Sequence, residues 1–153
     1  MCAAEDGLIQ NLHCFLQARP EGAGEIPLQV GTTTVQALRV PTAQPPPPLE
    51  IGFEELLEQL QANPNCHTEP DGWFAWTGYA GEIFWSLSGQ LTDDGQRVRL
   101  VELKGDCPPA TLATLQEMLS PQQQPLMIQL PQVGLFFDAH NFTTYRRAIA
   151  QAS

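Results

Sequence analysis

Apolar residues recur at helical spacing near the start of the chain. One side of a helix drawn over residues 8–18 carries a stripe of them: Leu8, Ile9, Leu12, Phe15 and Leu16. The Arg19-Pro20 pair would end this helix. Residues 26–41 favour two short strands around Gly31, because valine and threonine are enriched there and proline marks the ends. We therefore expect a small N-terminal segment with one helix and one pair of strands.

A run of four prolines follows this segment, at residues 45–48. Proline has no N–H to donate and favours an extended polyproline II chain. The run indicates a stiff linker over 45–49, which divides the chain into an N-terminal segment, 1–44, and a main domain, 50–153. A ligand for a proline-binding module is the alternative, but no basic anchor flanks the prolines.

The main domain alternates helical and strand patterns. In chain order they predict helix 53–62, strands 73–79, 82–91 and 97–104, helix 110–119 with Asp106 as its cap, strands 125–131 and 133–139, and helix 142–152 with Asn141 as its cap. Short turns join the three middle strands, so we expect them to pair as an antiparallel meander. The predicted fold class is α+β: an antiparallel three-stranded meander flanked by helices, with one or two further strands.

The chain is acidic, with 7 Lys and Arg against 17 Asp and Glu and a net charge of −10. This charge repels phosphate backbones and acidic lipids, so we expect neither nucleic acid nor a membrane as a partner. The first residues lack a basic leader, and no apolar window is long enough for a membrane span, which favours a cytoplasmic protein. The four cysteines form no Cys-x-x-Cys pair, so we expect free thiols rather than disulfides or a zinc site.

The only lysine of the chain, Lys104, lies on the strand predicted over 97–104, two positions after Glu102. Strand alternation places both side chains on one face and apolar residues on the other. With a three-residue turn before this strand, Glu102 would lie opposite Ser86 and Lys104 opposite Phe84. The two charges are either a solvated ion pair or part of a catalytic strand.

The order helix, three-stranded meander, helix, strand, with VELKG in the third strand, resembles the core of the PD-(D/E)xK nuclease-like superfamily over residues 50–131. The resemblance implies a magnesium ion held by an aspartate and by Glu102, with Lys104 polarising the attacking water. Asp71, which follows a proline before the first strand, is the aspartate that the resemblance would assign to the metal. The neighbouring second strand carries serines where the family has its aspartate.

Aromatic residues crowd the first two strands of the meander: Trp73, Phe74, Trp76, Tyr79, Phe84 and Trp85. They form either a stacking platform or part of the core, and strand alternation favours the core for most of them. Two hypotheses for the function follow. The first is a non-catalytic binding or accessory module without a cofactor, which contacts a protein partner through the exposed part of the aromatic meander. The second is a magnesium-dependent nuclease or phosphodiesterase with Glu102 and Lys104 as catalytic residues.

Overall fold

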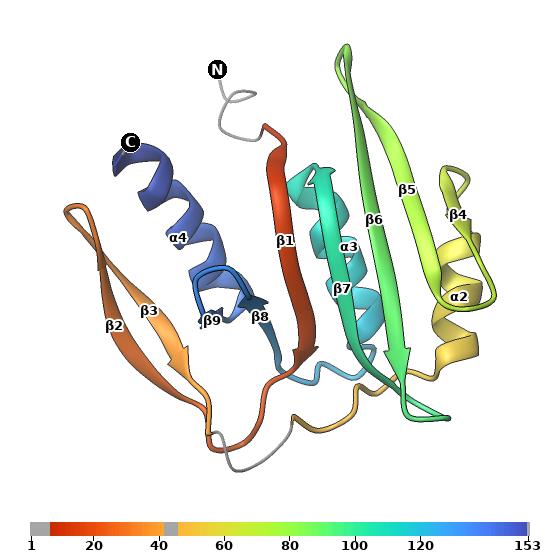
Figure 1. Ribbon diagram of the computed structural model, residues 1–153, viewed down its shortest axis with the longest axis horizontal. Helices are drawn as coiled ribbons and strands as arrows, with labels where there is room; N and C mark the ends of the chain where they lie inside the picture. The colour runs from red at the N-terminus through yellow and green to blue at the C-terminus, as the bar shows by residue number, and fades with distance from the viewer. Residues whose placement is uncertain (1–6, 42–45, 153) are drawn as a thin grey trace.

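The protein is built on one large antiparallel sheet. The computed structural model describes residues 7–41 and 46–152. Its strands are β1 Ile9–Ala18, β2 Gly24–Val30, β3 Thr33–Arg39, β4 Cys66–Thr68, β5 Trp73–Ala80, β6 Ile83–Asp93, β7 Val98–Cys107, β8 Leu126–Leu130 and β9 Leu135–Phe137. The described helices are α2 Phe53–Gln61, α3 Pro109–Leu119 and α4 Ala139–Ala152. Seven strands pair in the order β4-β5-β6-β7-β1-β8-β9, and β2 and β3 form a separate hairpin (Figure 1).

The predicted fold class, a three-stranded meander with one or two further strands, is wrong. The meander has a fourth strand, because β4 pairs with β5, and β1, β8 and β9 extend the same sheet to seven strands. β4 spans only three residues, too few for a recognisable alternation of apolar and polar positions. β8 enters the sheet through β1, a pairing between distant segments that local patterns do not reveal.

The helix predicted over residues 8–18 is also wrong, because this segment contains β1, an interior strand of the sheet between β7 and β8. The register of β1 against β7 shifts between Ile9 and Leu12. At the shift, Asn11 adopts a left-handed backbone with a φ of 55°, which asparagine tolerates better than most residues. The resulting bulge buries both Ile9 and Leu12, so a spacing typical of a helix arises within a strand.

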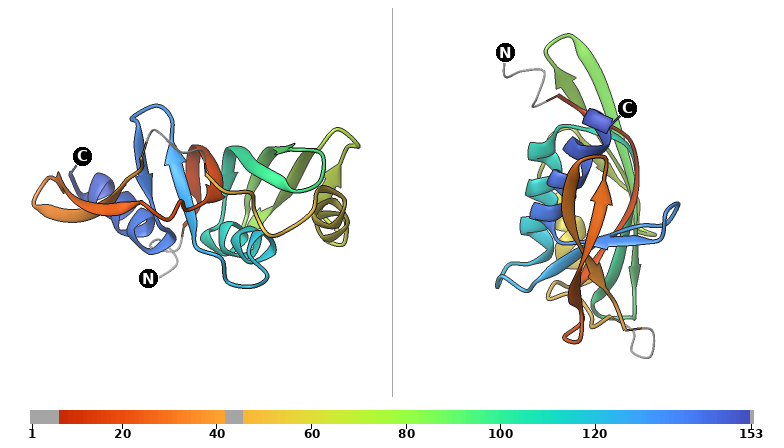
Figure 2. Two further views of the ribbon diagram at one scale, coloured as in Figure 1. Left: turned by 90° about the horizontal axis from the view of Figure 1, so that it is seen from below. Right: turned by 90° about the vertical axis from the view of Figure 1, so that its left-hand side faces the viewer.

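Three described helices cover one face of the sheet and leave the other without a helix (Figure 2). Each helix buries apolar residues: Leu56, Leu57 and Leu60 in α2, Leu112, Leu115 and Leu119 in α3, and Phe142 and Ala148 in α4. The sheet contributes alternate positions such as Leu16, Leu87 and Leu103, which are fully buried. The three helices predicted for the main domain are therefore confirmed. None of the described helices combines the length and the apolar character needed to cross a membrane.

Both predicted helix caps are wrong. α3 follows Pro108, which offers no side-chain hydrogen bond to the helix. Asp106 instead accepts the backbone N–H of Asn11 in the neighbouring strand β1, at 2.8 Å. α4 begins before Asn141, whose N–H is accepted by Asp138 Oδ1 at 2.8 Å. The capping carboxylate of α4 is therefore three residues earlier than predicted.

The pair of strands predicted around Gly31 is confirmed as the β2–β3 hairpin. It lies beside α4 and β9 at one end of the large sheet (Figure 1). Val35 and Ala37 of β3 are almost fully buried. The hairpin therefore contributes apolar side chains to the same core as the large sheet.

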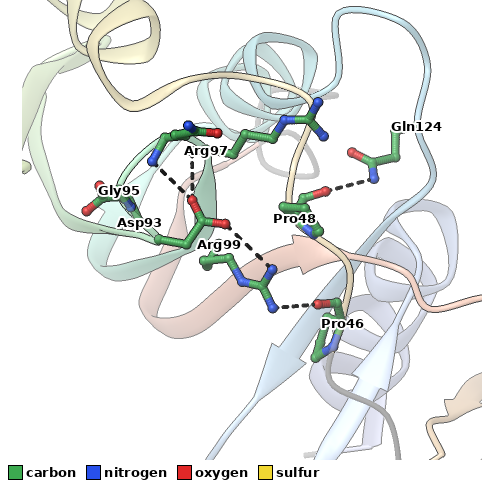
Figure 3. Close-up of polar contacts among 9 residues, drawn as sticks. Pro46, Pro48, Asp93, Gly95, Arg97, Arg99 and Gln124 are labelled. Carbon is green, nitrogen blue, oxygen red and sulfur yellow. Dashed lines mark hydrogen bonds and ion pairs between the residues drawn. The ribbon is translucent and has the colours of Figure 1, made fainter.

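The proline run is hydrogen-bonded to the rest of the protein; its first proline lies outside the described residues. Arg99 donates to the carbonyl of Pro46 at 3.0 Å, and Gln124 donates to the carbonyl of Pro48 at 3.1 Å (Figure 3). Leu49 is fully buried, and its N–H donates to a β7 carbonyl at 2.9 Å. Residues 46–49 therefore lie against the start of β7.

Candidate functional site

The face of the large sheet that has no helix, here called the open face, carries the Glu-x-Lys pair singled out from the sequence. Glu102 and Lys104 of β7 are partly and largely exposed, whereas Val101 and Leu103, which alternate with them, are fully buried. β1 contributes His13 at the position opposite Lys104. Strand alternation therefore predicts the face of the Glu-x-Lys pair correctly.

The predicted partners of this pair on β6 are wrong. Glu102 lies opposite Gln90, and Lys104 lies opposite Ser88. The β6–β7 connection is longer than a three-residue turn, and the register of the two strands shifts beside it, between Thr92 and Asp93. Compared with the predicted pairing, Glu102 and Lys104 each meet a β6 partner that is displaced by an even number of residues. Both side chains therefore keep their predicted face although their partners change.

Two carboxylates hold the β6–β7 turn: Asp93, which accepts the N–H of Gly95 at 3.1 Å, and Asp94. Asp94 Oδ1 accepts the N–H of Arg97 at 2.9 Å and that of Gln96 at 3.1 Å (Figure 3). These two backbone hydrogen bonds, with a smaller contribution from the charge of Arg99, hold the pKa of Asp94 below its usual value. Arg99 lies 3.9 Å from the Asp94 carboxylate and also donates to Pro46, so the turn and the proline run are linked.

Four side chains meet on the open face and form the Glu102 cluster: His13, Glu102, Lys104 and Gln132. His13 Nε2 lies 2.9 Å from Glu102 Oε2, and Lys104 Nζ lies 3.8 Å from the same oxygen. Gln132 Nε2 lies 2.9 Å from His13 Nδ1. The cluster joins β1, β7 and the turn between β8 and β9.

The hydrogen bonds fix the tautomer of His13. The amide nitrogen of Gln132 can only donate, so Nδ1 of His13 accepts and Nε2 carries the proton that is donated to Glu102. Both ring nitrogens are therefore engaged in hydrogen bonds. The exposed fractions of the side chains are 26% for His13, 32% for Glu102 and 62% for Lys104, so water screens the charges.

Asp71, the other predicted metal ligand, is not part of this cluster. Its carboxylate accepts the N–H of Trp73 at 3.0 Å in the turn before β5. Trp73 pairs with Gln90, which pairs with Glu102, so Asp71 lies at the end of β5, two strands from Glu102. At about 4.8 Å per strand, roughly 10 Å separates the backbones of β5 and β7.

Within the part of the chain that the structure describes, no other acidic side chain completes a metal site there. The glutamates of α2 belong to a helix on the opposite side of the sheet (Figure 2). Across residues 7–41 and 46–152, no three side chains of histidine, cysteine, aspartate or glutamate are grouped to hold a metal ion. The magnesium site and the nuclease activity that the resemblance implies stay predictions. The side chains next to Glu102 are a histidine and a lysine, whereas a hard cation prefers a second carboxylate as a ligand.

A second feature is the tip of the β5–β6 hairpin, which extends beyond both neighbouring strands (Figure 1). β7 pairs with β6 only from Leu87 onwards, and β4 pairs with β5 only up to Trp76. Three large apolar side chains at this end are together called the tip patch: Tyr79, Ile83 and Phe84, which are 71%, 60% and 54% exposed. Tyr79 and Phe84 lie on one face of the hairpin, and Ile83 lies on the other. Tyr79 and Phe84 are cross-strand partners whose rings meet edge to face at 5.4 Å.

The tip patch stands on a packed base. Trp85 is buried on the other face of the hairpin and lies over Gly78, where a Cβ would come within 2.6 Å of the indole ring. Gly78 and Trp85 are directly paired in the hairpin register. The indole ring of Trp85 therefore packs directly against the hairpin backbone, which a side chain at position 78 would prevent.

Sequence reasoning missed His13 and Gln132. His13 was assigned to a helix, and its partner Glu102 is brought near only by the pairing of β1 with β7. The recurrence of apolar residues at every second position, Leu12, Cys14 and Leu16, with the polar His13 between the first two, was the available signal for a strand. Gln132 lies in a turn and carries no local signal of its contact.

Comparison with known proteins adds no assignment. No protein-family model matches the chain, and no match was found among curated proteins or solved structures. The function is therefore argued from the Glu102 cluster and the tip patch.

Proposed function

We propose that the protein is a non-catalytic binding module that docks on a protein partner through the tip patch. The observation that carries this proposal is the exposure of Tyr79, Ile83 and Phe84 on a hairpin that extends past its neighbours. Large aromatic side chains are the usual anchors of protein interfaces, because they bury much apolar area with little loss of side-chain freedom.

The packed base of the hairpin supports this role. A rigid hairpin loses little conformational entropy when it binds, so more of the interaction free energy appears as affinity. Glu82 lies in the turn between the apolar side chains, and the whole chain has a net charge of −10. We therefore expect a partner with an apolar pocket and a basic rim, and neither nucleic acid nor an acidic membrane.

The Glu102 cluster fits a structural role beside this function. His13 and Lys104 compensate the carboxylate of Glu102 on the surface of the sheet. The module needs no cofactor for docking. We propose the cytoplasm as its compartment, because the three cysteines within the described residues are free thiols, two of them buried.

The test replaces Phe84 with a photocrosslinking amino acid and compares it with the same replacement of Val133. Val133 is a matched control, because it is 56% exposed and lies in the turn between β8 and β9, away from the tip. We expect position 84 to crosslink one protein that position 133 does not. The purified partner should then bind Tyr79→Ala and Phe84→Ala at least about tenfold more weakly than wild type, with Val133→Ala unchanged. A partner that binds both tip variants as tightly as it binds wild type would contradict the proposal.

A further inference from the structure

A groove of about 900 Å³ lies on the helix side of the sheet, between α3 and α4. In Figure 1 the start of β1 is seen between these two helices. The deep part of the groove is apolar, because its buried lining residues are Ile9, Leu112, Ile128 and Phe142. The volume falls within the range of about 300 to 1,000 Å³ that is typical of small-molecule sites.

The charge of the groove is opposite to that of the protein. Arg146 and Arg147 line it together with His140, all from α4. No aspartate or glutamate is among the described lining residues. In a chain with 17 acidic and only 7 basic Lys and Arg side chains, two adjacent arginines without an acid are a local excess of positive charge.

The guanidinium groups of this groove lack a counter-ion within the described residues. No carboxylate there lies within ion-pair distance of Arg146 or Arg147. Arg146 is only partly exposed, and burial, together with the charge of Arg147, lowers its pKa. Burial raises the pKa of the nearby Cys107 thiol to about 11, so this thiol is neutral at physiological pH and supplies no negative charge. A partly buried cation without a partner is costly, and an anionic ligand would remove that cost.

We propose that the groove between α3 and α4 binds a single-chain carboxylate amphiphile, with its carboxylate on Arg146 and Arg147 and its alkyl chain along the apolar lining. Arginine is suited to this contact, because its planar guanidinium can donate two parallel hydrogen bonds to one carboxylate. Leu112 and Ile128 offer the chain an apolar surface beneath the charged rim. This site lies on the helix side of the sheet and is independent of the tip patch.

The first test is a calorimetric titration of the full chain with dodecanoate below its micellar concentration. We expect saturable binding of one equivalent. Acetate, which has the head group without the chain, and dodecyltrimethylammonium, which has the chain with the opposite charge, should each bind at least about tenfold more weakly. Absence of saturable binding of dodecanoate, or equal binding of the cationic amphiphile, would overturn the proposal.

Two variants locate the site. Arg146→Gln removes a charged donor and should weaken binding of dodecanoate at least about tenfold. Arg39→Gln is the matched control, because it removes the same charge from an exposed position on β3, and it should change the affinity less than about twofold. Ala113→Phe adds a ring at an exposed position on the wall of the groove and should block the chain without disturbing the core.

Circular dichroism of each variant checks that the fold is kept, and Arg147→Gln gives a second, more exposed arginine substitution if Arg146→Gln unfolds. Unchanged affinity in both the arginine variant and Ala113→Phe would place the amphiphile elsewhere and overturn the proposal. Analytical ultracentrifugation tests whether a second copy of the chain, instead of an amphiphile, occupies the groove. A dimer that dissociates in Ala113→Phe would also overturn it.

Discussion

The imidazole of His13 and the carboxylate of Glu102 are in contact at 2.9 Å although 89 positions separate them in sequence. The contact links β1 to β7 on the open face, where no described helix packs against the sheet. Gln132 extends it to the turn between β8 and β9. The central strands are thus connected by side chains as well as by backbone hydrogen bonds.

Removal of His13 measures how much this link stabilises the fold. We expect His13→Ala to lower the free energy of unfolding by about 1 kcal/mol, because Glu102 loses a hydrogen bond at a partly exposed site. Urea denaturation gives the value. His67→Ala is the control, since His67 contacts Glu69, only two residues away, on an exposed edge strand. Equal losses of unfolding free energy in the two variants would show that the contact between His13 and Glu102 stabilises the fold no more than the contact between His67 and Glu69.

Magnesium binding separates the two hypotheses drawn from the Glu-x-Lys pair. We expect calorimetry with magnesium to give no saturable heat for wild type or for Glu102→Ala, because Asp71 is engaged in its own turn and the neighbours of Glu102 include two nitrogen groups. Saturable binding in wild type that Glu102→Ala abolishes would instead favour the nuclease hypothesis. A cleavage assay would then follow.

The glycine of VELKG has a conformational role. Gly105 has a φ of +125°, and a Cβ there would lie 2.3 Å from the carbonyl oxygen of Ser86. We expect Gly105→Ala to lower the free energy of unfolding by about 3 kcal/mol or more. Gly95→Ala is the control, because Gly95 has a φ of +100° but open space around it, and should cost about 1 kcal/mol. Comparable losses in thermal or urea unfolding would rule out the steric contact as the main cause.

Two buried thiols predict a loss of stability at alkaline pH. Burial raises the pKa of Cys14 from 9.0 to about 12 and that of Cys107 from 9.0 to about 11. The folded protein therefore keeps both protons where the unfolded chain releases them, so stability is intact below pH 9 and falls as the pH rises towards 11 to 12. We expect a loss of about 1 kcal/mol for each thiol between about pH 9 and pH 10.

Urea denaturation at several pH values tests this dependence. Cys14→Ala and Cys107→Ala should each remove part of the slope of unfolding free energy against pH, even if the variants are less stable at neutral pH. An unchanged slope in the double variant would assign the alkaline loss to other groups.

Local patterns predict the elements whose neighbours in the sheet are also neighbours in sequence. The β5–β6–β7 meander and the β2–β3 hairpin are of this kind, since short turns determine which strands pair. The pairings of β1 with β7 and β8 leave no local signal, and the bulge at Asn11 gives β1 a helical spacing of apolar residues. The candidate site divides in the same way: the face of Glu102 and Lys104 follows from alternation, whereas the contact with His13 depends on a distant pairing.

The interior position of β1, between β7 and β8, also determines when the sheet can be completed during synthesis. β1 is the first described strand to leave the ribosome, yet both of its neighbours, β7 and β8, are made much later, after the hairpin, α2 and most of the meander. Until then both edges of a largely apolar strand have no partner in the sheet, and such unpaired edges promote aggregation of nascent chains. We therefore expect the high contact order of β1, rather than the local meander, to limit the folding rate.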